Sequence, residues 1–218
     1  PEQFKPGEYD PDPKFKDKFV ILMAGRLARE KRHDAVIQAI KKSKHQNNIQ
    51  LVVTGKGHLR EELEQLGKSL AVPPLFTYVS QKELIRLFNT AHLFIHASEV
   101  ELEGMAVLEA IGCGLPALIA NSDSSASNQF AINEKFLFSV DDTDELSSRI
   151  DYWYENRGEL ESARKQYLEK VEQYSFTACA QKTEVLYRNV ISDTRNKSSQ
   201  LCGESGREIA EVNGESQI

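Results

Sequence analysis

Cysteine and long apolar runs are scarce in this sequence, and each shortage excludes a class of protein. The three cysteines, Cys113, Cys179 and Cys202, are odd in number and far apart, and no C-x-x-C or H-E-x-x-H spacing accompanies them. This pattern predicts free thiols in a reducing compartment and no structural zinc. No segment approaches the roughly eighteen apolar residues of a membrane span, and no signal-peptide pattern opens the chain. We therefore expect a cytoplasmic protein.

Positive charge is also in short supply. The 218 residues include 27 Lys and Arg against 33 Asp and Glu, which gives a formal net charge of −6. Because nucleic-acid binding depends on neutralising phosphates over a broad surface, this balance predicts no nucleic-acid partner, although a local basic cluster could still hold a small polyanion. The length and an apolar content of 40% allow one compact domain with appendages.

The two ends of the chain differ in composition from the middle. The chain begins with Pro1 rather than Met, and residues 1–17 are rich in proline and charge. Such a composition is typical of an extended interdomain linker, so we expect another domain to precede this one in a longer protein. From Ser192 onward the sequence is rich in Ser, Asn, Glu and Gly with little periodicity, which predicts a disordered tail over residues 193–218.

Between these ends, short apolar runs alternate with helical patterns. The runs predict buried strands over residues 18–25, 49–55, 75–80, 92–98, 116–121 and 135–139. Helical spacing of apolar residues predicts helices over 33–44, 58–70, 81–91, 105–114, 143–156 and 158–174, with a further C-terminal helix over 176–192. This alternation favours a mostly parallel sheet with helices on both faces, a Rossmann-like three-layer α/β domain over residues 18–175.

The loop after the first strand carries cations. In a parallel sheet, ligands bind beyond the carboxyl ends of the strands, and this loop, "GRLAREK", begins there. Gly25 lets the backbone turn tightly, while Arg26 and Lys31 can reach back over the sheet edge. An arginine fork and a mobile lysine together suit the oxygens of a diphosphate. The alternative explanation is a solvated basic start to a helix.

The loop after the second strand, "GKGHLREEL", places Gly55 and Gly57 before a helix. This spacing is similar to the opening of a dinucleotide fingerprint, but Arg60 stands where the third glycine would be. The loop also follows the second strand rather than the first, so the pattern disfavours NAD binding. Two interpretations stay open, a plain strand-to-helix turn and a wall beside a bound nucleotide.

The segment "ELEGMAVLE" follows the fourth strand and is more informative. It places Gly104, Met105 and Ala106 at the N-terminus of a helix, where free N–H groups and the helix dipole favour an anion. A carboxylate accepts hydrogen bonds from a vicinal diol, so Glu109 suits a ribose, and Glu101 in the preceding loop suits sugar hydroxyls. The alternative is that acids near a helix start are ordinary capping residues that face water.

Together, these loops, the segment "SEVELEGMAVLEAIGCGLPALIA" and the strand–helix order resemble the donor-binding half of retaining, GT-B-fold glycosyltransferases of the family-four type. The resemblance spans residues 18–175, and its most specific element is the E-x7-E motif from Glu101 to Glu109. It implies that Arg26 and Lys31 hold the donor diphosphate. It also implies that Glu109 binds the ribose and that Glu101 contacts the transferred sugar near its reacting carbon.

The same resemblance implies further contacts to the donor. Backbone groups from Gly104 to Ala106 would complete the phosphate and sugar contacts, and the loop after the third strand would lie against the base, with Val79 and Ser80 nearest. Glu103 departs from the family pattern, which often has an aromatic residue before this glycine. The departure leaves the identity of the donor sugar open.

The segment "IANSDSSASNQFAINEKFLF" is similar to bacterial enzymes that glucosylate diacylglycerol-type membrane lipids. That likeness implies a hexosyltransferase that uses UDP-glucose, with GDP-mannose as an alternative, and a lipid or saccharide acceptor. It further implies retention of anomeric configuration and peripheral attachment of the full-length protein to a membrane. We expect no metal or other cofactor, because the cations and the helix N-terminus offset the leaving-group charge. The acceptor-binding domain, also Rossmann-like, would precede Pro1, so this chain alone should bind donor without turnover.

Two other function classes stay open. A non-catalytic nucleotide-sugar-binding or interaction module would keep the fold without the chemistry. A Rossmann oxidoreductase would need a complete glycine fingerprint after the first strand and an acid after the second, and "GRLAREK" supplies neither.

Overall fold

The computed structural model describes residues 3–192 and 194. By its internal contacts the chain divides into two units, Pro1–Glu172 and Gln173–Ile218. Residues 176–192 of the second unit are helical, where the sequence predicts the C-terminal helix. Apart from residue 194, the tail predicted to be disordered lies outside the described residues. No helix in the described ranges combines the length and apolarity that crossing a bilayer demands.

The first unit contains one six-stranded sheet in which every neighbouring pair of strands is parallel. Its strands are β1 (Phe19–Ala24), β2 (Ile49–Thr54), β3 (Leu75–Thr77), β4 (Leu93–His96), β5 (Ala117–Asn121) and β6 (Leu137–Ser139). Six α-helices follow the predicted pattern: α1 (His33–Lys42), α2 (Arg60–Gly67), α3 (Gln81–Thr90), α4 (Met105–Gly112), α5 (Thr143–Glu155) and α6 (Arg157–Val171). The predicted Rossmann-like α/β fold is confirmed.

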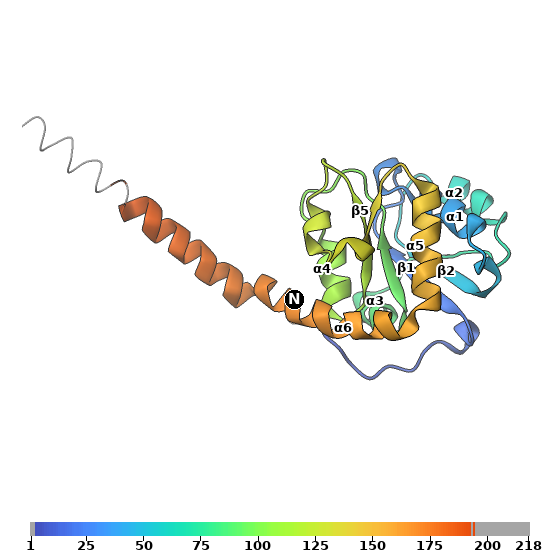
Figure 1. The fold of residues 1–218 in the computed structure, drawn as a ribbon, viewed down its shortest axis with the longest axis horizontal. Helices are drawn as coiled ribbons and strands as arrows, with labels where there is room; N and C mark the ends of the chain where they lie inside the picture. The colour runs from blue at the N-terminus through green and yellow to red at the C-terminus, as the bar shows by residue number, and fades with distance from the viewer. Residues whose placement is uncertain (1–2, 193, 195–218) are drawn as a thin grey trace, which may run out of the picture. The chain divides into compact units, whose positions relative to one another are not determined.

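The strand order is β3-β2-β1-β4-β5-β6, so the chain winds outward from β1 in one direction and from β4 in the other. Right-handed crossovers then place α1 and α2 on one face of the sheet and α4 on the other. Helix α1 packs on α2 and α5, while α4 packs on α6. In Figure 1, α4 lies beside β5 and α2 lies beyond β2, which follows this division.

Strand β3 ends three residues before its predicted limit. The Oγ of Ser80 accepts a hydrogen bond from the Glu83 amide at 3.3 Å and caps α3, so the chain has left the sheet by this point. Val79 and Ser80 therefore lie in the loop between β3 and α3.

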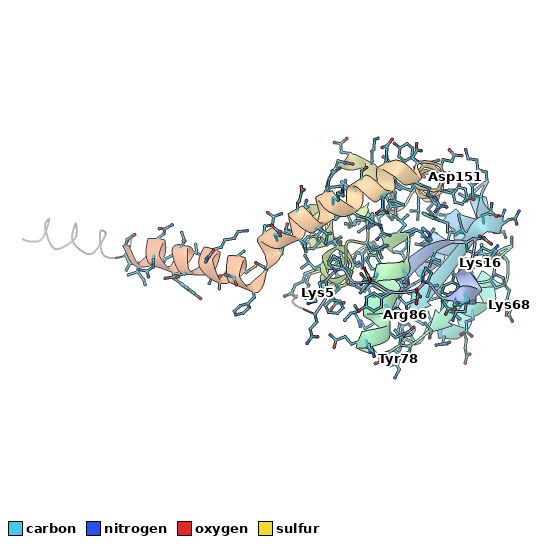
Figure 2. All side chains as sticks on the ribbon, turned by 90° about the horizontal axis from the view of Figure 1, so that it is seen from below. Lys5, Lys16, Lys68, Tyr78, Arg86 and Asp151 are labelled. Atoms are coloured by element: carbon cyan, nitrogen blue, oxygen red, sulfur yellow. The ribbon has the colours of Figure 1, made fainter. Side chains whose placement is uncertain are left out.

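The proline-rich segment before β1 contacts the C-terminal half of α3. The Gly7 amide donates to Asn89 Oδ1 at 2.8 Å, and Arg86 Nη2 donates to the Asp10 carbonyl at 3.0 Å. The Phe4 ring meets Phe88 edge to face, with ring centroids 6.1 Å apart. In Figure 2, Arg86 lies between Lys5 and Lys16, two residues of this segment.

The loops after β1 and β2 are joined backbone to backbone, which explains the glycines there. The Leu27 amide donates to the Lys56 carbonyl at 2.9 Å, and the Leu59 amide donates to the Leu27 carbonyl at 3.3 Å. A Cβ on Gly55, whose φ is 156°, would lie 1.8 Å from the Gly25 carbonyl oxygen. A Cβ on Gly57 would lie 2.2 Å from the Leu27 carbonyl oxygen. Both glycines are required for this close approach of two loops.

We predict that Gly55→Ala lowers the free energy of unfolding by more than about 2 kcal/mol, because the new methyl group would overlap a backbone carbonyl. Gly158→Ala is the matched control: a Cβ on Gly158, within α6, would have open space around it. The control should change stability by less than about 1 kcal/mol, in the stabilising direction. Urea unfolding at pH 7 measures both, and similar values for the two variants would contradict the packing explanation.

Candidate functional site

The candidate site lies at the carboxyl edge of the sheet, where β1 and β4 are neighbours. The strand order reverses between these two strands, and in open parallel sheets such a reversal leaves a crevice between the loops that follow them. The loop after β1 carries Arg26 and Lys31, and the loop after β4 carries Glu101. Residues separated by about seventy positions in the chain thus meet at one edge.

Lys31 and Glu101 are in direct contact. Lys31 Nζ lies 2.5 Å from Glu101 Oε2, and the two side chains are only 17% and 20% exposed. The other predicted diphosphate-binding residue, Arg26, is 77% exposed, and its Nη2 lies 2.9 Å from Glu30 Oε1. Each of the two cations is therefore paired with a carboxylate.

Glu101 is held through both its backbone and its side chain. Its amide donates to the Ser124 carbonyl at 3.2 Å, and its carbonyl accepts from the Ala126 amide at 2.9 Å. The loop after β5 thereby fixes the Glu101 backbone. On the side-chain oxygen Oε2, His96 Nε2 approaches to 3.4 Å, an ion-pair distance rather than a well-formed hydrogen bond.

The neighbours of Glu101 keep its carboxyl group ionised. His96 and then Lys31, through side-chain interactions with the carboxylate, lower the pKa of Glu101 to about 2, against the opposing effect of burial. Close by, burial lowers the pKa of His33 to about 4. At neutral pH the site therefore contains an ionised Glu101 beside a neutral His33.

The two loops are also locked to each other by the Glu30 carbonyl. It accepts a hydrogen bond from the Glu99 amide at 2.9 Å and from Ser98 Oγ at 3.3 Å. Arg32, which follows Lys31, reaches the loop after β6, where its Nη1 lies 3.0 Å from Asp141 Oδ1. These contacts fix the separation of Lys31 and Glu101 before any ligand arrives.

Helix α4 begins beside this pair of loops. Gly104 is its N-cap with a φ of 69°, a left-handed conformation that favours glycine. A Cβ there would lie 2.9 Å from Ser127 Cβ and 3.0 Å from Phe130 Cε2. The glycine is thus needed for the turn and for packing within the chain. The amides of Met105 and Ala106 occupy the first turn of α4, where N–H groups lack partners inside the helix.

Glu109 lies in the second turn of α4 and is half buried. Burial raises the pKa of its carboxyl group, in the direction opposite to that of Glu101. No ion pair to Glu109 occurs among the residues with described side chains. A half-buried carboxylate of this kind can accept hydrogen bonds from a bound ligand.

The third loop contributes an aromatic residue that the sequence analysis did not single out. Tyr78, between β3 and Val79, is 64% exposed, and Lys56 Nζ lies 3.9 Å from the centre of its ring. Figure 2 shows Tyr78 projecting outward at the surface of the domain. Lys56 comes from the loop after β2, between Gly55 and Gly57, so the second and third loops meet at this ring.

Sequence reasoning also missed His96, because it sits within an apolar run that predicts a buried strand. Its position as the last residue of β4, at the ligand-binding edge of the sheet, is the signal that could have found it. His33, at the first position of α1, was missed for a similar reason. In the described residues, no group of three or more His, Cys, Asp or Glu side chains is arranged to hold a metal ion.

The sheet order and the converging loops define an α/β domain of the Rossmann type, with its candidate site at the β1–β4 reversal. Within that class, residues 8–171 match the family model described as "Glycosyl transferases group 1". The chain belongs to this family, and its parallel six-stranded sheet matches the domains of GT-B glycosyltransferases.

A solved structure with substantial sequence identity supports this assignment. The catalytic domain of cholesterol-alpha-glucosyltransferase from Helicobacter pylori is 38% identical, with a TM-score of 0.70. The match covers 72% of this chain and 99% of that one. HepE of Anabaena in complex with UDP and glucose has a TM-score of 0.69 at 18% identity, covering 80% of this chain and 50% of that one, a likeness of fold alone.

Among curated relatives, the alpha-monoglucosyldiacylglycerol synthase of Acholeplasma laidlawii is 24% identical over 185 residues. That alignment covers 83% of this chain and 46% of the synthase. The chain spans less than half of the length of each curated relative it matches, from 25% to 46%.

We predict that Glu101→Gln destabilises the chain by about 1–3 kcal/mol at pH 7, because it removes the charge that pairs with Lys31 in a part-buried setting. A carboxyl group whose folded pKa is depressed contributes stability that is fully present above its unfolded pKa of about 4.5 and is lost as pH falls through about 2. The difference between variant and parent should therefore shrink between pH 4.5 and pH 3 in urea unfolding experiments.

Glu103→Gln is the control, because Glu103 is exposed and no ion pair to it occurs in the described part of the chain. It should change stability by less than about 0.5 kcal/mol at every pH tested. If Glu101→Gln were equally destabilising at pH 7 and pH 3, packing rather than charge would explain its effect.

Proposed function

We propose that this chain is the donor-binding part of a hexosyltransferase that moves glucose from UDP-glucose to a lipid acceptor with retention of anomeric configuration. The observation that carries the proposal is the meeting of Lys31 and Glu101 at the β1–β4 reversal, beside the N-terminus of α4. A cation, a carboxylate and free helix amides are the groups that a sugar joined to a diphosphate requires.

In the proposed reaction, the bond between the sugar carbon and the diphosphate oxygen breaks while an acceptor hydroxyl oxygen bonds to the same carbon from the leaving-group face. Negative charge develops on the departing diphosphate, which takes up the hydroxyl proton. Lys31, Arg26 and the amides of Met105 and Ala106 stabilise that charge, and no metal ion is then required. Lys31 must exchange part of its contact with Glu101 for a phosphate oxygen, and Arg26 must do the same with Glu30. Both cations are long and flexible enough for this exchange.

Glu101 and Glu109 have separate roles in this proposal. Glu101, ionised and held by the loops after β1 and β5, accepts hydrogen bonds from hydroxyls of the transferred sugar. Glu109, half buried on α4, accepts hydrogen bonds from the ribose diol. The base would rest against the loop after β3, which contains Tyr78, Val79 and Ser80. Gly55 and Gly57 shape the neighbouring loop after β2, whose Lys56 lies over the Tyr78 ring.

Support for glucose and for a lipid acceptor comes from the relatives. One relative is a cholesterol-alpha-glucosyltransferase, and another is an alpha-monoglucosyldiacylglycerol synthase. Both names specify an alpha-linked glucose on a lipid. Because UDP-glucose is itself an α-glucoside, an α-linked product corresponds to retention. The acceptor and the groups that bind it would belong to a preceding domain, and peripheral attachment to a membrane would bring the full-length protein to its lipid.

The donor assignment predicts a selective thermal response. UDP should raise the unfolding temperature of this chain more than GDP or ADP at equal concentration, because ligand binding stabilises only the folded form that recognises it. UDP-glucose should raise it further than UDP. A larger shift with GDP and GDP-mannose would replace UDP-glucose by the alternative donor, and no shift with any of these nucleotides would refute the proposal.

The separate roles of Arg26 and Glu109 predict crossed effects in calorimetry. Arg26→Ala should weaken the binding of UDP and of inorganic pyrophosphate by a similar factor, roughly tenfold or more, since it removes a charge-assisted hydrogen bond to phosphate. Glu109→Ala should weaken the binding of UDP far more than the binding of pyrophosphate, because only the nucleotide has a ribose.

Lys68→Ala is the control for removal of a cation. Lys68 is exposed after the end of α2 and hydrogen bonds only to Gln65 among the described contacts, and Figure 2 shows it at the surface. It should leave both affinities unchanged. If Glu109→Ala lost as much affinity for pyrophosphate as for UDP, the proposal that Glu109 binds the ribose would be wrong.

A further inference from the structure

His96 is a buried histidine whose outer ring nitrogen has no regular partner. The residue is 4% exposed at the end of β4, and Nε2 forms no hydrogen bond. Its only close polar neighbour among the described ion-pair contacts is Glu101 Oε2, at 3.4 Å. A buried polar atom left in this state costs free energy, and an apolar side chain at the same position would avoid that cost.

The unsatisfied nitrogen points to a second state of the site. In the observed state, Lys31 is the close partner of Glu101, at 2.5 Å from the same carboxylate oxygen. If Lys31 turns toward the diphosphate of a donor, Glu101 loses that partner while its side chain remains largely buried. His96 is then the remaining neighbour that can donate to the carboxylate, and a small side-chain adjustment would convert 3.4 Å into a hydrogen bond.

Charged, titratable and aromatic groups surround His96. Lys31 contributes positive charge on the side of Glu101, and the neutral His33 lies close enough to interact electrostatically with His96. The ring of Phe94, two residues earlier on the same strand, stacks with the imidazole at a centroid distance of 6.3 Å. This stacking keeps the ring in place beside Glu101.

We propose that His96 is a positioning residue that holds Glu101 in its sugar-binding orientation when Lys31 leaves it for the donor diphosphate. This inference rests on the proposed function. It assigns to His96 no contact with the donor, because the ring is buried behind the carboxylate. It also gives the two neighbours of Oε2 different roles: Lys31 is exchangeable, and His96 takes over when Lys31 leaves.

The test compares the affinity gained from the sugar in three variants of this chain. For each variant, calorimetry gives the dissociation constants for UDP and for UDP-glucose. The quantity compared is the dissociation constant for UDP divided by that for UDP-glucose, which measures the affinity gained from the sugar. His96→Leu should reduce this ratio about tenfold relative to the unchanged chain, with UDP affinity within a factor of two. His96→Gln, which restores an N–H donor, should recover most of the ratio. Leu93→Val, a core substitution on the same strand, should lower stability without changing the ratio.

A second readout is independent of nucleotide binding. Carboxyl-carbon NMR with labelled glutamate should show the pKa of Glu101 rising in His96→Leu toward its ordinary value, and rising less in His96→Gln. In a Lys31→Met background, where His96 is the remaining partner, the effect of His96→Leu should be larger.

The outcomes separate the two proposals. The positioning role would be overturned if the pKa of Glu101 were unchanged in His96→Leu, or if that variant lost affinity for UDP and for UDP-glucose equally. Either result would leave the proposed function intact. Failure of the unchanged, folded chain to bind any nucleotide would refute the proposed function. The NMR comparison would then still decide whether His96 holds Glu101.

Discussion

The contact between Lys31 and Glu101 depends on one constraint, the pairing of β1 with β4 at the centre of the sheet. These strands are separated by two complete strand–helix units, yet they lie side by side, with Ile21 and Leu22 opposite Leu93 and Phe94. Any other strand order would separate the loops that follow them. The hydrogen bonds to the Glu30 carbonyl and the backbone hold on Glu101 refine a geometry that this pairing creates.

The site is organised by opposite charges that are already paired. Glu30 pairs with the exposed Arg26, and Glu101 pairs with the part-buried Lys31. For Lys31, the pairing offsets the desolvation cost of a lone charge. An anionic ligand must compete with these carboxylates, which reduces affinity but adds selectivity for ligands that also satisfy the released acids. A sugar attached to a diphosphate can satisfy Glu101, whereas a free phosphate cannot.

The surface around the site is uneven in polarity. Beside Glu101, Leu102 and Met105 are 87% and 52% exposed, which is unusual for large apolar side chains next to a polar crevice. They flank Glu103, the acid that departs from the resembling family's pattern.

The sequence by itself determined the class of fold, because apolar runs long enough for buried parallel strands alternate with helical periods and leave few other arrangements. It also determined that Gly104 opens a helix, since a glycine before an apolar helical pattern is a local signal. It did not determine why the glycine is needed: Ser127 and Phe130, which a Cβ would meet, come from a distant loop. Likewise, the pairing of Lys31 with Glu101 and the buried, unsatisfied nitrogen of His96 were decided only by the tertiary structure. Such contacts depend on which strands are neighbours, and strand order arises from packing across the whole sheet rather than from any local pattern of residues.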